Sequence, residues 1–300
     1  MEQLNPNDLL IYARVADAGS FSKAAERLGL PKSTVSRRIA LLEEQLGERL
    51  MVRSTRRSTF TEFGLQLLEN ARQVAAEVDA VAALRERRQV EPTGRLRVSM
   101  PSEIASLLLE NMLVTYATTY PGVALELDLS PRRVDLLAEG FDIALRIGNL
   151  PDDATLVARK LASMSNSLYA SPDYLALHGE PQTPEELVHH KGALILRSNN
   201  EYLGWTLLKG KARWDGAPQC AFAANSPGLL VRMASAGCGI VGVHDRFAAT
   251  RLKSGELRRV LPQWSLPSDP AWAVFAGRKL LPTKTRAFID MLQAALGEAD

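Results

Sequence analysis

The stretch from Phe21 to Gly47 reads FSKAAERLGLPKSTVSRRIALLEEQLG and decides the fold of the first part of the chain. Residues Ser22–Leu28 have the length of two helical turns, and Gly29 suits the left-handed backbone that ends many helices. A second helix is expected from Pro31, which has no N–H to leave unpaired at a first helical position, to about Leu46. The stretch therefore predicts two short helices joined by a tight turn.

The second of these helices is amphipathic. Apolar residues recur along it at three- and four-residue spacing, at Val35, Ile39, Leu42 and Leu46, so one face is buried. The opposite face carries hydroxyl and cationic side chains near the N-terminal end. A helix pair with such a second helix predicts a helix-turn-helix whose second helix enters the major groove of DNA.

Side chains near the start of this helix have the chemistry of DNA contacts. Lys32, Ser33 and Thr34 are placed to reach base edges, although the Lys32 ammonium could equally hold a phosphate. The polar and basic residues one turn later, at 36–38, are placed to contact phosphates. The arginines of the segment RSTRR at 53–57 would lie along the DNA backbone or enter an adjacent minor groove. The predicted DNA-binding residues are Lys32, Ser33, Thr34, Ser36, Arg37, Arg38, Arg53, Arg56 and Arg57.

The distribution of charge supports this prediction. The whole chain has 36 Lys and Arg residues against 34 Asp and Glu residues, a net charge of +2. Residues 20–60 alone hold nine Lys or Arg residues and four Glu residues, which gives this short segment a net charge of +5. Positive charge is concentrated where the helix pair lies, as expected for a segment that faces phosphates.

The flanks of the helix pair complete a winged head. A helix is expected over Pro6–Ala18, and two short strands over Leu50–Arg53 and Ser58–Thr61 form the wing. Thr61 is a predicted N-cap of a long helix that reaches about Arg88. Its apolar positions have heptad spacing, which favours pairing with a second copy over packing as an ordinary surface helix on its own domain. The predicted dimerisation residues are Leu67, Ala71, Val74, Val78 and Val81.

From Arg95 onward the pattern changes to strands that alternate with helices, which predicts parallel strands and right-handed crossovers. Ligands of such sheets bind outside the carboxyl ends of the strands. A helix N-terminus at Ser102 together with Arg146 would suit a carboxylate, and the alternative for Arg146 is a structural ion pair with a nearby acid such as Asp142. The predicted ligand-binding residues are Met100, Pro101, Ser102, Arg132, Arg146, Gly148, Ser198, Tyr202, Asn225, Pro227 and His244.

The sequence lacks the signatures of several other classes of protein. The N-terminus has no signal-peptide pattern and no segment approaches eighteen uninterrupted apolar residues, so we expect a cytoplasmic protein with no membrane partner. Two cysteines, Cys220 and Cys238, are too few for a disulfide framework, and the His189–His190 pair lacks metal-ligand spacing. A redox role for Cys238 is the weaker alternative to packing beside a strand. No nucleotide-binding or nucleophile motif is present, so we expect no metal, no cofactor and no enzyme.

The quoted motifs resemble the N-terminal domain of LysR-type transcriptional regulators. The resemblance covers roughly residues 5–65, through GSFSKAAERL at 19–28, STVSRRI at 33–39, LEEQLG at 42–47, RSTRR at 53–57 and TEFG at 61–64. The rest of the chain matches less distinctively. GFDIALRIG at 140–148 and AGCGI at 236–240 are similar to the subgroup that includes regulators of aromatic-acid efflux and adhesion genes. Pro31-Lys32-Ser33 departs from the family's usual opening of the recognition helix, which often presents Gln to a base.

The resemblance implies an all-α winged helix-turn-helix head with a long linker helix, followed by an α/β effector domain. That domain would have two Rossmann-like subdomains, as in periplasmic binding proteins, joined by two crossing strands with the effector between them. The expected divisions are 1–61 for the DNA-binding domain, 62–90 for the dimerising linker helix and 91–300 for the effector domain. Within the effector domain, subdomain I spans about 91–163 and 269–300, and subdomain II spans about 164–268.

The expected function is therefore that of a LysR-type regulator. Its DNA binding or bending would be controlled by a small-molecule effector, such as an aromatic or other organic acid, and its subunits would form dimers and then tetramers. A metabolic α/β enzyme with an accessory DNA-binding head, or a solute-binding protein with a similar two-lobed fold, are the weaker alternatives.

Overall fold

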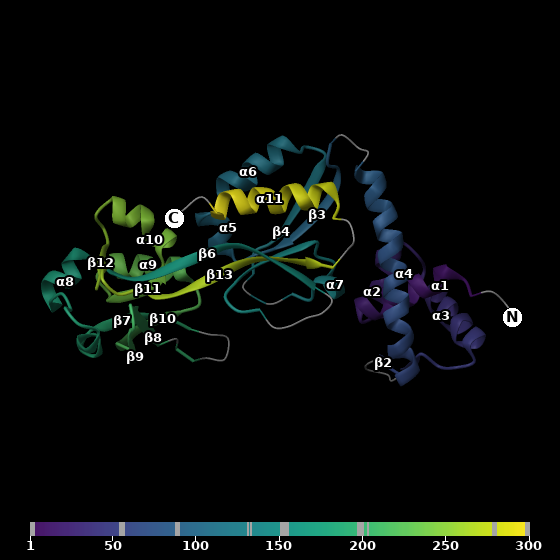
Figure 1. Ribbon diagram of the computed structural model, residues 1–300, viewed down its shortest axis with the longest axis horizontal. Coiled ribbons are helices and arrows are strands. Elements are labelled where there is room, and N and C mark those ends of the chain that lie inside the picture. Colours follow the sequence, from purple (N-terminus) through teal and green to yellow (C-terminus); the bar gives the residue numbers. More distant parts are fainter. Residues whose placement is uncertain are drawn as a thin grey trace.

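The computed structural model shows a helical head beside a long helix and a two-lobed α/β body (Figure 1). The chain is elongated, and the head and the more distant lobe lie at opposite ends. The structure describes residues 4–53, 58–87, 91–130, 132, 134–150, 156–196, 201–202, 204–277 and 281–297. None of the helices in these ranges combines the length and apolar character required to span a bilayer.

The head closely follows the predicted pattern. Its elements are α1 (Pro6–Ala18), α2 (Phe21–Leu28), α3 (Lys32–Leu46), β1 (Met51–Arg53), β2 (Ser58–Phe60) and the long α4 (Glu62–Arg87). Pro31 lies just outside α3 as its N-cap, with φ −59° and ψ 142°, so the helix begins one residue later than predicted. Gly29 ends α2 at φ 63°, as the sequence indicates. The two strands pair antiparallel and form the predicted wing.

The core of the head joins all its helices. Tyr12, Ile39, Leu42 and Leu50 are fully buried there. The Tyr12 hydroxyl donates a hydrogen bond to the Gly64 carbonyl at 2.8 Å. Burial, with a smaller contribution from Glu43, raises the pKa of Tyr12 to about 12. This contact fixes the start of α4 against α1.

The first half of α4 belongs to the head rather than to a dimer seam. Thr61 caps α4 as predicted, because its Oγ1 accepts a hydrogen bond from Gly64 N at 2.9 Å. Ala71 is fully buried against the head, so its predicted place in a dimer seam is wrong. Leu67 packs partly against the same core, whereas Val78 and Val81 are 51% and 66% exposed. The heptad pattern thus combines an internal packing face with an exposed continuation.

The body is built on one mixed sheet of nine strands, not on purely parallel sheets as the alternating pattern predicts. Its path is β10-β7-β11-β6-β13-β5-β3-β4, with β12 attached to β6. Two long antiparallel strands occupy the middle of this order and extend across both lobes (Figure 1). The strands are β3 (Gly94–Ser99), β4 (Val123–Asp128), β5 (Ile143–Ile147), β6 (Leu156–Ala170), β7 (Lys191–Ile195), β10 (Gln219–Ala224), β11 (Ile240–His244), β12 (Arg258–Val260) and β13 (Leu266–Ala276).

Helices cover the sheet in each lobe. The helical segment that begins at Ser102 is divided into two helices, because the helical path is interrupted at Leu108 and Leu109 and Leu109 is buried in the core of the lobe nearer the head. A hairpin of β8 (Trp205–Lys209) and β9 (Ala212–Gly216), absent from the prediction, buries Trp205 and Leu207 in the other lobe. The helices are α5 (Ser102–Leu107), α6 (Glu110–Thr119), α7 (Leu136–Glu139), α8 (Pro172–His178), the 3-10 helix Pro184–His189, α9 (Pro227–Ser235), α10 (Asp245–Lys253) and α11 (Thr283–Gly297).

The close approach of α4 to the wing predicts a strong effect of Gly64→Ala. A Cβ atom at Gly64 would lie 2.1 Å from the Leu50 carbonyl oxygen, a backbone atom that cannot move alone. We expect Gly64→Ala to lower the free energy of unfolding of the head by about 3 kcal/mol or more.

Gly228→Ala in α9 is the matched control, because the new Cβ would meet its nearest neighbour at an ordinary 3.5 Å. Its effect should stay within about 1 kcal/mol. Calorimetry of the full chain checks both variants, and equal melting temperatures for Gly64→Ala and the wild type would contradict the packing described for α4.

Candidate DNA-contacting face and effector cleft

The polar face of α3 is open. Lys32, Ser33 and Arg37 are exposed, Thr34 and Ser36 are half-buried, and Val35 between them is fully buried. The apolar residues of α3 recur every three or four positions and share one face, so folding of the head turns the hydroxyls and cations of the other face outward. The N-terminal end of α3, where the predicted base-contacting residues lie, is therefore free of the head's own core.

Arg38 has a structural partner. Its Nη1 lies 3.0 Å from Oδ1 of Asp8, a carboxylate that is almost completely buried in α1. A buried carboxylate needs such a partner because burial without one is costly. Arg38 thus ties α3 to α1, and its predicted phosphate contact stays a prediction. The side chain of Arg53 and all of Arg56 and Arg57 lie outside the described residues.

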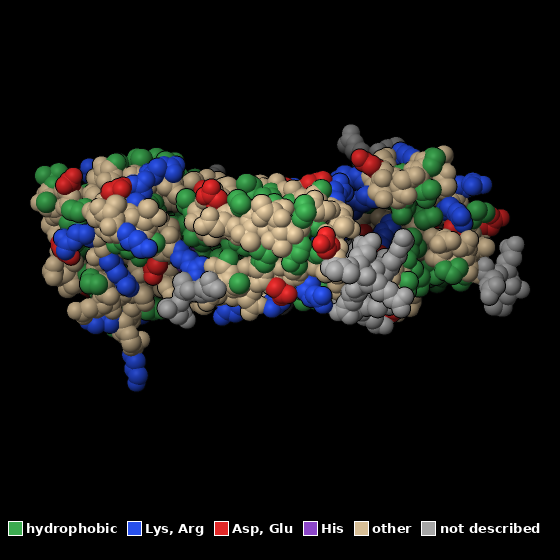
Figure 2. Space-filling model, turned by 90° about the horizontal axis from the view of Figure 1, so that it is seen from above, with side chains coloured by type: hydrophobic (Ala, Val, Ile, Leu, Met, Phe, Trp, Pro, Cys, Tyr) green, Lys and Arg blue, Asp and Glu red, His purple; other side chains and the backbone are tan. Residues whose placement is uncertain are grey.

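Lys and Arg side chains occur on the head and also on the lobe farthest from it (Figure 2). On that lobe several of them face acids: Arg251 pairs with Glu256, and Arg258 lies 3.5 Å from Glu180. These pairs neutralise part of the charge there. Basic side chains alone therefore do not distinguish the head from that lobe in this view.

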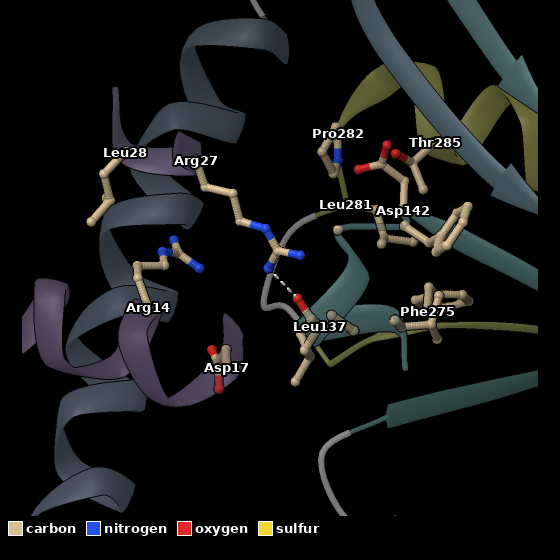
Figure 3. Close-up of a pocket in the computed structure, with 14 residues that line it drawn as sticks. Arg14, Asp17, Arg27, Leu28, Leu137, Asp142, Phe275, Leu281, Pro282 and Thr285 are labelled. Atoms are coloured by element: carbon tan, nitrogen blue, oxygen red, sulfur yellow. Dashed lines mark hydrogen bonds between the residues drawn. The ribbon is translucent and has the colours of Figure 1, made fainter. Parts of the chain in front are cut away.

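The head contacts the nearer lobe through Arg27 (Figure 3). The guanidinium of Arg27, on α2, donates to the carbonyl oxygen of Leu137 at 2.6 Å and also to that of Ala138. Both carbonyls belong to the single turn of α7, where they have no helical partners. Partial burial, followed by the nearby charge of Arg97, lowers the pKa of Arg27. This contact connects the predicted DNA-binding head to the α/β body.

A cleft lies between the two lobes, at the carboxyl ends of the strands, as the sheet rule predicts. The nearer lobe contributes Pro101 and Ile147, and the other lobe contributes Asn225 and His244. The long strands β6 and β13 supply the floor that joins them. Among the predicted residues, the cleft is lined by Pro101, Asn225, Pro227 and His244.

Other predicted effector residues lie elsewhere. Met100 is fully buried in the core of the nearer lobe, so its predicted contact with a ligand is wrong. Ser102, Gly148 and Tyr202 do not line the cleft, and Ser198 lies outside the described residues. Arg132 is directed to acids, with Asp128 at 3.2 Å and Glu139 at 2.5 Å.

Arg146 stabilises the strand ends rather than facing the cleft. Its guanidinium donates to the carbonyls of Leu145 and Ser99, at 2.8 and 3.2 Å, and to the Ser99 hydroxyl at 2.9 Å. The suggested partner Asp142 accepts instead from the backbone N–H of Arg97 at 2.9 Å. No ion pair between Arg146 and Asp142 occurs among the described residues. Because these bonds direct Arg146 to the strand ends, its predicted contact with a carboxylate ligand stays a prediction without support from this arrangement.

Two carboxylates that the sequence did not single out line the cleft. Glu103, in the first turn of α5, accepts hydrogen bonds from the hydroxyls of Ser226 at 2.6 Å and Ser102 at 2.8 Å. Burial raises the pKa of Glu103, but these hydrogen bonds outweigh burial and leave the pKa below its usual value. Asp269 accepts from the Asn166 amide at 3.0 Å. Glu103 adjoins the predicted Ser102, whereas Asp269 enters through an irregularity in β13 that no local signal reveals.

His244 is a neutral donor at the wall of the cleft. Its Nδ1 accepts the Arg246 backbone N–H at 3.2 Å, so the proton of the neutral ring resides on Nε2. Nε2 is buried and has no hydrogen-bond partner among the described residues. The side chain is 8% exposed, and burial lowers its pKa to about 4. His244 therefore stays uncharged at neutral pH.

The histidine pair and the two cysteines form no common site. His190 is buried, with Nδ1 3.2 Å from the Tyr174 hydroxyl, while His189 is exposed. Cys220 is exposed and Cys238 is half-buried. No group of His, Cys, Asp and Glu within the described ranges could hold a metal ion.

The depressed pKa of His244 predicts a pH dependence of stability. The unfolded chain binds this proton near pH 6.5 and the folded chain near pH 4, so the stabilisation is complete above pH 6.5 and is lost as the pH falls toward 4. The loss is on the order of 3 kcal/mol. His244→Asn, which keeps an acceptor for Arg246, should lack this component in chemical unfolding at several pH values.

His189→Asn is the control, because His189 is exposed and should leave the pH profile unchanged. Parallel profiles for the wild type and His244→Asn between pH 4 and 6.5 would disprove the burial assigned to His244.

Comparison with known proteins gives consistent matches over nearly the whole chain. Residues 6–65 match the family "Bacterial regulatory helix-turn-helix protein, lysR family", and residues 89–297 match "LysR substrate binding domain". An HTH-type transcriptional regulator of Xanthomonas campestris pv. campestris (strain 8004) is 38% identical over 294 residues, which cover 97% of this chain and 85% of that protein. The HTH-type transcriptional activator AaeR of Escherichia coli (strain K12) is 30% identical over 283 residues, covering 94% and 91%.

A solved structure of a similar protein has the same overall fold as this chain. The structure of CrgA, a LysR-type transcriptional regulator from Neisseria meningitidis, matches with a TM-score of 0.63 and 32% identity, and covers 99% of this chain and 100% of that one. The matches include both the head and the α/β body.

Proposed function

The chain belongs to the LysR family of bacterial transcriptional regulators, and on that premise we propose that it inserts α3 into DNA and that a small molecule in the interlobe cleft controls this binding. The observation that carries the proposal is the open polar face at the start of α3, on a helix whose other face is buried. We also propose the divisions 1–61, 62–90 and 91–300 as DNA-binding, dimerising and effector-binding parts. Because its proposed partner is chromosomal DNA, the protein would act in the bacterial cytoplasm. It would not catalyse a reaction.

In this proposal the residues of α3 have separate roles. Lys32, Ser33 and Thr34 reach base edges, because they occupy the end of the helix that enters the groove first. Ser36 and Arg37 hold phosphates one turn later. Phosphate contacts supply affinity for every duplex, and base contacts supply the preference among sequences.

Dimerisation is proposed through the exposed part of α4. Val78 and Val81 are exposed apolar side chains on the half of the helix that extends beyond the head's core. A second copy of α4 would cover them and place two α3 helices on one DNA site, and two such dimers would form the tetramer expected of the family. Relative to the sequence prediction, the seam omits Ala71.

The cleft is suited to control because a ligand there touches both lobes at once. A molecule that fits one lobe arrangement better shifts the population toward it, typically by about 1 to 3 kcal/mol in coupled systems. The contact of Arg27 with α7 offers a route from the nearer lobe to the head. The expectation of an aromatic or other organic acid as effector loses its support, because Arg146 is engaged with strand ends.

Selection of genomic DNA fragments by the full chain tests the proposed function. Enrichment of a few fragments that share a pseudo-palindromic sequence is expected, whereas uniform recovery of the genome would contradict sequence-specific regulation.

Arg37→Ala tests the phosphate contact on the selected duplex. We expect weaker binding to specific and random duplexes alike, and the slope of log affinity against log salt should fall by about one because one phosphate contact is lost. Fluorescence anisotropy at several salt concentrations measures it. Lys211→Ala, at the exposed turn of the β8–β9 hairpin, is the control with a wild-type slope. A wild-type slope for Arg37→Ala would remove this residue from the DNA interface.

Val78→Asp combined with Val81→Asp tests the dimer. Two carboxylates in an apolar seam should leave the chain monomeric in sedimentation and weaken operator binding on the order of a hundredfold, because the second half-site is lost. Gln73→Asp adds charge at an exposed polar position of the same helix and should remain dimeric. Dimers of the double variant would place the interface elsewhere.

A further inference from the structure

We propose that the interlobe cleft takes an amine: a compact ligand with an apolar body, a cationic ammonium group and a hydrogen-bond acceptor. This inference rests on the proposed function of the cleft as the effector site, and it deepens that function by naming the ligand's chemical class. Three features of the lining carry it: two carboxylates, one buried unpartnered donor and an apolar surface.

The charged groups at the lining are acidic. Glu103 and Asp269 both line the cleft, and no Lys or Arg lines it among the residues that the structure describes there. Arg232, on α9, acts on Glu103 through space but is not part of the lining. Two carboxylates in a partly enclosed cleft repel an anionic ligand and attract a cationic one.

Both carboxylates can accept further hydrogen bonds. An ionised carboxylate has about four acceptor positions. Glu103 uses one on each oxygen, for Ser226 and Ser102, and Asp269 uses one oxygen for Asn166. Their existing partners fix the orientation of the carboxylates, so an ammonium group would meet acceptors that are already in place.

His244 indicates a ligand independently of the acids. It is nine-tenths buried, it lines the cleft, and its Nε2–H has no partner among the described residues. A buried N–H without an acceptor is unfavourable, so a hydroxyl or carbonyl oxygen of a ligand would satisfy it. Because the ring is neutral, it can donate this bond without adding a positive charge that would oppose an ammonium group.

The rest of the lining is apolar. Ile104 and Ile147 come from the nearer lobe, Ile195, Trp205 and Phe247 come from the other lobe, and Leu266 of β13 completes the surface. This lining suits the body of an organic amine. An inorganic cation fits poorly, because the described residues include no cluster with enough metal-ligating groups.

Matched probes test the charge preference on the full-length wild-type protein. We would use 3-(4-methoxyphenyl)propylamine, the corresponding propan-1-ol and the corresponding propanoate, whose shared methoxy oxygen can accept from His244, in thermal-shift and calorimetric titrations at neutral pH. The amines should raise the melting temperature and bind at least about tenfold more tightly than the alcohols, and the carboxylates should bind least. Tighter binding of the carboxylates, or no shift with any amine, overturns the proposal.

Two variants locate the binding. Glu103→Gln and Asp269→Asn should each weaken amine binding about tenfold and leave alcohol binding within about twofold. Glu110→Gln, exposed on α6 outside the cleft, is the control and should bind the amines like the wild type. Amine binding that is unaffected by both cleft variants overturns the assignment to this site.

These outcomes are separable from failure of the proposed function. The wild-type chain without ligand is also assayed for selective DNA binding. Selective DNA binding with no preference for amines overturns only the ligand class, whereas loss of DNA selectivity overturns the regulator itself.

Discussion

The pairing of β6 with β13 is the constraint on which the α/β body depends. These antiparallel strands are paired from Leu156 opposite Ala276 to Asn166 opposite Leu266, and their register shifts at two points between these ends. All the other strands of the large sheet attach on one side or the other of this pair. Because the pair runs through both lobes, it holds them together and also forms the floor of the space between them (Figure 1).

The irregular part of this pairing produces the chemistry of the cleft. The register shifts between Leu266 and Asp269, and a bulge of this kind redirects side chains that regular pleating would alternate. Asp269 and its partner Asn166 thus reach the cleft from the two crossing strands. The acidic character of the lining depends on the same backbone feature that joins the lobes.

The head was predictable because its signals are local. Pro31 and Gly29 mark helix ends, Thr61 caps the next helix, and the spacing of Val35, Ile39 and Leu42 identifies the buried face. The predicted boundaries are accordingly within one or two residues. Long-range pairing escaped prediction: the exposed first part of β6 has no apolar alternation, and its partner strand lies about a hundred residues later. The burial of Ala71 depends likewise on how α1 folds back on α4.

The cleft was predictable in position and only partly in composition. The rule for strand ends located Pro101, Asn225, Pro227 and His244, because it depends on topology. It could not tell that Met100 turns into the core or that Arg146 folds back on Ser99, since those orientations depend on neighbouring strands. The position of Asp269 in the cleft depends on the register shift in β13, which the sequence pattern does not reveal.

Control of DNA binding from the cleft is tested most directly by reciprocal titration. The affinity of the full chain for its operator is measured with and without a saturating cleft ligand, and the affinity for that ligand is measured with and without operator in the same buffer. Each pair of measurements gives the ratio of the affinity with the second ligand to the affinity without it. Coupling requires the two ratios to be equal and to differ from one, because linkage between two binding sites is reciprocal. Two ratios of one would contradict control of DNA binding by the cleft.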